Sequence, residues 1–168
     1  MRNTAAGKCA FAGLMLSLTL LALLLTAVLP VNKLFLLAVS SVFTSLVLLE
    51  CGRKWAWLFY LAASALGLWL LPLGPGNLAY VFFFGNWGLV REFLTSSSKY
   101  LALLLKLAYF NLMLLALYWL AVRLGLSPKL PFSFAMALFW LASQAGLLVY
   151  DRALQLFLVY YAARFQAR

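Results

Sequence analysis

Few residues in this sequence are able to do acid–base chemistry. The chain has no histidine and only three acids, Glu50, Glu92 and Asp151. Each acid lies beside lysine or arginine at the end of an apolar run, so we expect ion pairs there rather than two carboxylates sharing one catalytic pocket. With only two cysteines, Cys9 and Cys51, and no histidine, the sequence predicts neither a disulfide nor a metal site.

A hydrolytic nucleophile would have to be a serine activated by a lysine. Ser98 and Lys99 are adjacent, but residues 95–98 form a Thr-Ser-Ser-Ser stretch directly before a long apolar run. Serine and threonine are preferred at helix N-termini, which explains this stretch as a cap. No phosphate-binding Gly-Lys-Ser/Thr motif occurs in the chain. We therefore predict that the protein is not an enzyme and has no cofactor or ATPase of its own.

Among the polar side chains inside the apolar runs, those of Lys106, Asn111 and Gln144 are costly. Lys106 is about 9 Å from the end of its run at 1.5 Å per residue. Its ammonium group could therefore reach the membrane surface, or could pair with Glu50 or Glu92, and both interpretations remain open. Asn111 and Gln144 are expected to form hydrogen bonds between helices.

The composition explains why polar side chains are so scarce. Hydrophobic residues make up 67% of the 168 residues, charged residues make up 10%, and the mean hydropathy is +1.04. A water-soluble domain is about a quarter charged, so lipid must cover much of this surface. The net charge of +10 comes from cations scattered between apolar runs, which is typical of membrane topology and not of nucleic-acid binding.

The apolar runs predict an all-α integral membrane protein with a single membrane domain over residues 1–168. A crossing needs about 20 apolar residues, and six runs are candidates, at residues 9–29, 34–49, 55–71, 77–90, 100–122 and 130–150. Residues 151–168 carry apolar side chains at helical spacing, which predicts an amphipathic cytoplasmic extension that lies on lipid or on a partner. The expected fold is a six-transmembrane-helix bundle with this C-terminal extension.

The fourth run, residues 77–90, is short and contains Gly85, Asn86 and Gly88, so a re-entrant segment is the alternative to a crossing. The positive charges decide between them, because cytoplasmic loops are enriched in lysine and arginine. If the run crosses, nine cations lie inside and three outside; if it does not, the division is six and six. The nine are Arg2, Lys8, Arg53, Lys54, Arg91, Lys99, Arg152, Arg164 and Arg168, and the three are Lys33, Arg123 and Lys129. We therefore predict a multi-pass protein of the cell membrane with both termini in the cytoplasm.

Small residues recur near the N-terminus. Ala6, Ala10 and Gly13 are three or four residues apart, which places them on one helix face where another helix can approach closely. Packing within the protein and docking on a partner both fit this face.

Together these features resemble the substrate-binding S-component families of energy-coupling-factor (ECF) transporters, including uncharacterised relatives from Gram-positive bacteria. The similar features are the basic N-terminus with Ala6 and Ala10, six helices in fewer than 200 residues, and the sequence ECGRK at residues 50–54. Residues 80–85 and 104–112 also look like a hypothetical membrane protein family of clostridia-like organisms.

The resemblance implies a subunit that binds a vitamin or other micronutrient from outside and has no ATPase of its own. Its expected partners are a coupling transmembrane subunit, on which Ala6 and Ala10 would dock, and paired ATPases. The ligand pocket is expected to open outward, with aromatic walls and few polar groups. The residues expected around it are Asn32, Lys33, Trp69, Asn77, Tyr118 and Trp119.

A structural protein is the alternative. The small membrane scaffold of the rod-shape elongation complex is similar in length and apolarity, although the acidic motif expected after its second helix is not found here. Such a scaffold would associate with cell-wall synthases and would transport nothing.

Overall fold

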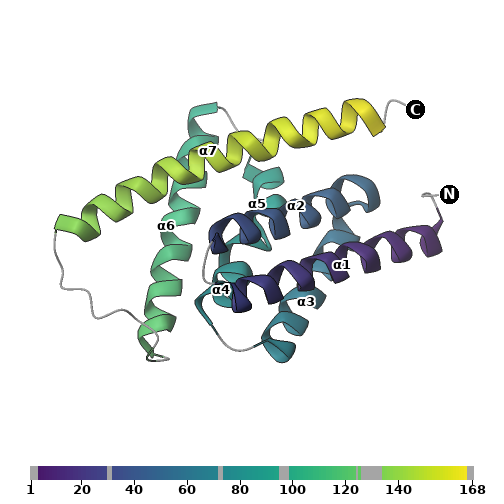
Figure 1. Ribbon diagram of the computed structural model, residues 1–168. Coiled ribbons are helices and arrows are strands. Elements are labelled where there is room, and N and C mark those ends of the chain that lie inside the picture. The colour runs from purple at the N-terminus through teal and green to yellow at the C-terminus, as the bar shows by residue number, and fades with distance from the viewer. Residues whose placement is uncertain are drawn as a thin grey trace. The chain divides into compact units, whose positions relative to one another are not determined.

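A computed structural model describes residues 4–29, 32–71, 74–94, 99–123, 125 and 134–165 (Figure 1). The regular elements of these residues are all helical, with no strand among them. The chain divides into two compact units, residues 1–126 and residues 127–168, and each is described by itself.

Three helices form the core of the first unit: α1 (Ala5–Val28), α2 (Lys33–Cys51) and α3 (Arg53–Leu70). Each packs against the other two. The chain reverses between α2 and α3 at Gly52, whose φ of 92° is open to glycine but strained for other residues. Apolar side chains from all three helices fill the contact, among them the fully buried Leu23, Val47 and Ala56.

Among the described residues, three helices are long and apolar enough to cross a membrane by length and composition. They cover Ala5–Val28, Lys33–Cys51 and Tyr100–Leu120, with mean hydropathies of 2.3, 2.1 and 1.9. These agree with the predicted runs at residues 9–29, 34–49 and 100–122. The protein is therefore helical and has segments compatible with insertion into a bilayer.

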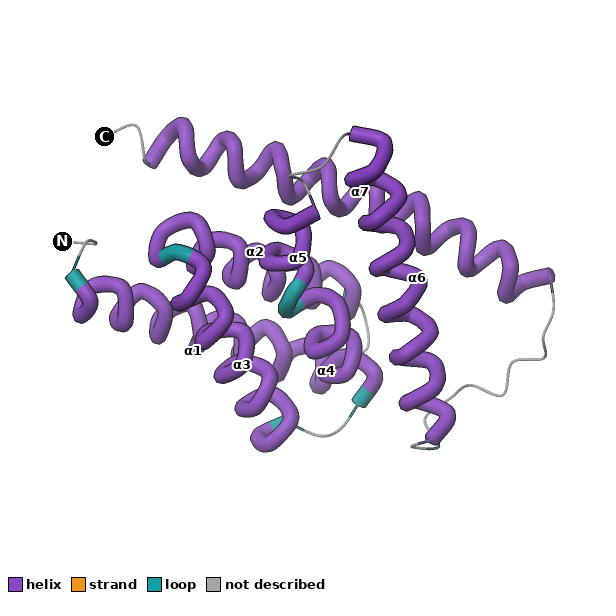
Figure 2. The backbone as a smooth tube through the Cα atoms, turned by 180° about the vertical axis from the view of Figure 1, so that it is seen from behind, coloured by secondary structure: helices purple, strands orange, loops and turns teal. Residues whose placement is uncertain are grey.

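The fourth predicted run is a broken helix. It consists of α4 (Pro75–Ala79), a π-helix η1 (Tyr80–Phe84), a turn at residues 85–86 and α5 (Trp87–Leu94). Much of it is buried within the first unit, where η1 and α5 pack on α2. The smooth tube in Figure 2 follows this change of path between α4 and α5.

The broken segment runs from one end of the α1–α3 core to the other. At its start, Gly76 lies against Thr26 near the end of α1. At its finish, Glu92 pairs with Arg53 at the start of α3. Cys51 Sγ lies 3.8 Å from the Lys8 carbonyl oxygen, so the start of α1 is at that same end.

Helix α6 (Lys99–Arg123) packs on the broken segment. The rings of Phe110 and Phe83 are 5.0 Å apart, and those of Tyr109 and Trp87 are 6.1 Å apart. Figures 1 and 2 both show α6 running across the α1–α2 pair instead of alongside it. Its contact with the core is therefore made mainly through the fourth segment.

The second unit contains one long helix, α7 (Phe134–Phe165). Its 32 residues make it about 48 Å long at 1.5 Å per residue, longer than the hydrocarbon layer of about 30 Å. The predicted crossing at residues 130–150 and the predicted extension at residues 151–168 thus share one helix. Residues 130–133 and 166–168 lie outside the described residues.

Candidate functional site

The break in the fourth segment has a specific backbone pattern. The Gly85 N–H donates to the Tyr80 carbonyl oxygen at 2.7 Å, a bond that spans five residues instead of four. A Cβ atom at Gly85 would lie 2.9 Å from that oxygen and 3.0 Å from the Tyr60 ring. Only glycine fits without a shift of the backbone. Single π-helical turns of this kind are frequent at functional sites.

A tyrosine on α3 satisfies a backbone group beside the break. The Tyr60 hydroxyl donates to the Val81 carbonyl oxygen at 2.8 Å. The side chains of Ser64 and Asn86 lie close to the same hydroxyl, although the Ser64 hydroxyl and the Asn86 carboxamide oxygen have no hydrogen-bond partner among the described residues. Irregular backbone at membrane depth requires partners of this kind.

Two further tyrosines face the same region. Tyr80 of η1 is fully buried, and its hydroxyl lies near Thr44 of α2 and near Tyr60. Tyr109 of α6 lies near Asn86 and Tyr60. We call Tyr60, Tyr80, Asn86 and Tyr109 the tyrosine cluster; it brings together α3, the broken segment and α6.

The cluster and its surroundings contain buried polar atoms that have no hydrogen-bond partner within the described ranges. Four of these residues, Ser41, Thr44, Tyr80 and Trp87, have no exposed surface. Burying such a group without a partner costs about 1–3 kcal/mol, and a bound molecule or water, or a neighbouring group of the same set, can supply the missing partner. The atoms are Ser41 Oγ, Thr44 Oγ1, Ser64 Oγ, Tyr80 OH, Asn86 Oδ1, Trp87 Nε1 and Tyr109 OH.

The start of α5 is part of this site. The Asn86 carbonyl oxygen accepts from the N–H groups of Leu89 and Val90 at 3.0 and 2.9 Å, so Asn86 is the residue preceding the helix. Asparagine in this position usually caps the helix with its side-chain oxygen. Here Asn86 Oδ1 makes no such bond within the described part of the chain. Among the described residues, the first N–H groups of α5 therefore receive no cap from the Asn86 side chain.

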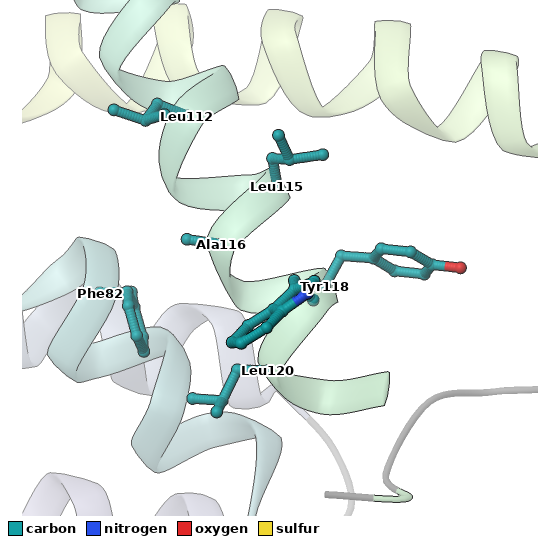
Figure 3. A pocket seen from close by; sticks show the side chains of 7 residues that line it. Phe82, Leu112, Leu115, Ala116, Tyr118 and Leu120 are labelled. Carbon is teal, nitrogen blue, oxygen red and sulfur yellow. The ribbon is translucent and has the colours of Figure 1, made fainter. Parts of the chain in front are cut away.

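An apolar groove of about 580 Å³ lies between η1 and α6. Figure 3 shows Phe82 extending from η1 toward Ala116 and Leu120 of α6, whereas the Tyr118 ring points away from Phe82. Leu112 also lines the groove, and it lies three residues after Tyr109, on the same face of α6. The groove thus begins about one helical turn from the tyrosine cluster.

The predicted pocket residues lie at several places. Tyr118 and Trp119 line the groove, and Asn77 is buried in α4. Trp69 is 83% exposed at the end of α3, and Lys33, at the start of α2, is exposed as Asn32 is. Tyr118 and Trp119 are the only pair of these residues that the described structure brings into one cavity.

Arg53 and Glu92 form an ion pair of the kind that the sequence predicts. Arg53 Nη2 lies 3.5 Å from Glu92 Oε1, with both side chains about half exposed, so the pair stabilises the fold only slightly. The Arg53 guanidinium also lies 4.4 Å from the centre of the Phe93 ring. Glu50 is half-buried at the end of α2.

The polar residues predicted inside the membrane lie on two helices. Lys106 is half-buried on α6, one turn before Tyr109. Asn111 Nδ2 donates to the Leu107 carbonyl oxygen at 2.8 Å, within its own helix. Gln144 belongs to α7. The interhelical bonds expected for Asn111 and Gln144 stay predictions.

The small-residue face of α1 is open. Ala6, Ala10 and Gly13 are exposed, and a Cβ added at Gly13 would meet no atom within 4 Å. This face therefore does not pack within the first unit.

The tyrosine cluster is not among the sites predicted from the sequence. Its best signal was Asn86 between Gly85 and Gly88 in an apolar run, which we interpreted as a sign of a short segment. The tyrosines come from three distant parts of the sequence and had no local pattern to unite them. The described residues contain no group of three or more potential metal ligands.

Comparison with protein-family models, with curated proteins and with solved structures gives no match to this chain.

Proposed function

We propose that this protein is a multi-pass subunit of the cell membrane that binds a small molecule, and that it serves an ECF-like transporter without an ATPase of its own. The observation that carries the proposal is the broken fourth segment with its buried polar atoms. The expected ligand is of the vitamin or micronutrient type.

The physics of membranes supports this proposal. A break in a membrane helix is tolerated where protein or a cavity surrounds it, and transporters bind their substrates at such breaks. Polar side chains inside a membrane are expensive and usually serve a function. The tyrosine cluster combines both features, and the adjacent groove supplies an apolar surface for the rest of a ligand.

The proposed topology has six crossings with both termini in the cytoplasm. Its support is the division of cations, nine against three, in the sequence. The path of the broken segment adds to this support, because Glu92 lies at the same end of the core as Arg53 and Lys8, while Gly76 lies at the opposite end.

Cysteine labelling tests the topology at residues 124–127. In a background with Cys9→Ser and Cys51→Ala, we expect Ser127→Cys to react with a membrane-impermeant maleimide added to intact cells, because this loop follows the fifth crossing. Lys54→Cys is the matched control on the other side, and it should react only after the membrane is permeabilised. The reverse pattern at residue 127 would show that the fourth segment does not cross.

Ligand binding is tested with the purified full chain in detergent. We expect at least one water-soluble vitamin to raise the thermal unfolding midpoint, because a ligand that binds only the folded state stabilises by about 2.7 kcal/mol at a hundred times its Kd. A screen in which every vitamin leaves the midpoint unchanged would contradict the proposed function.

The proteins that associate with this chain distinguish the proposed transporter subunit from the scaffold alternative. The exposed face with Ala6, Ala10 and Gly13 suits close approach of another helix. We expect the tagged chain to co-purify with a coupling membrane subunit and ATPases, and replacement of Ala6 and Ala10 by leucine to abolish this association. Association with cell-wall synthases instead would support the scaffold.

A further inference from the structure

We propose that the tyrosine cluster and the start of α5 bind the carboxylate group of a small ligand whose apolar body lies in the groove between η1 and α6. This inference rests on the proposed function and specifies the chemistry of its ligand.

The start of α5 supplies the first part of the argument. The N–H groups of a first helical turn carry partial positive charge and need acceptors. Asn86 precedes the helix, yet its Oδ1 atom makes no hydrogen bond within the described residues. A ligand oxygen can occupy the place that a capping side chain would normally take.

The buried side chains supply the second part, independently of the helix. Trp87 is fully buried and its Nε1–H, which can only donate, has no partner in the described part of the chain. The hydroxyls of Tyr80 and Tyr109 lie near Thr44 and Asn86 but do not reach hydrogen-bond geometry with any described residue. Each of these groups can donate a hydrogen bond to an acceptor, and a carboxylate offers about four acceptor positions.

Charge favours an anion over a cation. The chain carries a net charge of +10, and Lys106 lies three residues before Tyr109, on the same face of α6. The two acids of the first unit, Glu50 and Glu92, lie in the last turns of α2 and α5, whereas a divalent cation at the cluster would need carboxylate ligands. A carboxylate therefore agrees better with the charges around the site.

The size and apolar lining of the groove indicate the chemical character of the rest of the ligand. Its volume is about 580 Å³ and its lining is apolar, with Phe82 and Ala116 on opposite sides. Since Leu112 at its edge is about one turn from Tyr109, a carboxylate at the cluster would leave an aliphatic or aromatic body beside Phe82. The ligand class is thus a monocarboxylate with an apolar body.

The test uses matched pairs of acids and neutral analogues on the purified full chain. The probes are nicotinate with nicotinamide, biotin with biotinamide, and pantothenate with panthenol, with riboflavin and thiamine as compounds that lack a carboxylate. We expect at least one acid to raise the unfolding midpoint and its neutral partner to bind about ten- to hundredfold more weakly, because a hydrogen bond to a charged group is lost.

Two conservative variants localise the site. Tyr109→Phe and Tyr80→Phe keep the ring and remove the donor, and each should weaken binding of the acid about tenfold or more while the neutral analogue is unaffected. Tyr100→Phe is the matched control, since the Tyr100 side chain is 90% exposed at the start of α6. It should bind the acid as the unmodified chain does.

The outcomes separate this inference from the proposed function. If riboflavin, thiamine or a neutral analogue stabilises the chain and no acid does, the proposed function stands and the carboxylate site is wrong. Equal binding of acid and neutral analogue, or unchanged binding in both Tyr→Phe variants, also overturns the site. If no probe changes the midpoint, both proposals fail.

Discussion

Gly85→Ala is expected to destabilise the protein by about 2–4 kcal/mol. The new Cβ would lie 2.9 Å from the Tyr80 carbonyl oxygen and 3.0 Å from the Tyr60 ring, and overpacking of this kind costs about 1–3 kcal/mol. A displaced Tyr60 would also lose its hydrogen bond to Val81, which costs about 1 kcal/mol more. The measurement is the thermal unfolding midpoint in detergent, followed by tryptophan fluorescence.

Gly13→Ala is the matched control. Gly13 lies inside α1, and an added Cβ there meets no atom within 4 Å. Because alanine favours the helix over glycine by up to about 1 kcal/mol, we expect the midpoint to stay the same or to rise. Equal effects of the two substitutions would show that the backbone at the break is not tightly packed.

Lys106→Met is expected to destabilise the protein by a few kcal/mol. This substitution keeps the apolar stem and removes the charge. If Lys106 pairs with Glu50 or Glu92, a carboxylate is left without its cation, and the cost is about 3 kcal/mol when that group is desolvated. Lys54→Met, at an exposed position near the start of α3, is the control and should have almost no effect.

Double-mutant cycles identify the partner of Lys106. We expect Glu50→Gln or Glu92→Gln to recover part of the loss when it is combined with Lys106→Met, with a coupling of at least about 1 kcal/mol. Glu92 contacts Arg53 at 3.5 Å in a pair that is about half exposed. The Glu92→Gln substitution alone should therefore destabilise the protein less than Lys106→Met does. Strict additivity in both cycles would mean that Lys106 only extends to the membrane surface.

The sequence predicted the helical class and most helix boundaries of the first unit. Long apolar runs leave few alternatives to helices in lipid, because every backbone group must be satisfied within its own segment. The predicted run at residues 100–122 differs from α6 by one residue at each end. The predicted run at residues 55–71 ends one residue after α3, directly before Pro72, because proline interrupts helices.

The form of the fourth segment could not be derived from its residues. Composition showed that residues 77–90 are short for a crossing and contain Gly85 and Asn86. Whether the helix kinks, ends or continues there depends on what packs against it, and the Tyr60 hydroxyl that reaches Val81 is 21 residues away in sequence.

By itself, the sequence determined the chain's helical class, its apolar runs and the cation division on which its proposed topology rests. These follow from local composition, since about 20 consecutive apolar residues specify a crossing wherever they occur. Only the tertiary structure decided that Tyr60 and Tyr109 lie near Asn86 with Tyr80 near Tyr60, and that Tyr118 and Trp119 share a groove while Trp69 lies apart. Contacts between separate helices depend on how their surfaces pack, and helical spacing shows which residues share a face but not which helix that face meets.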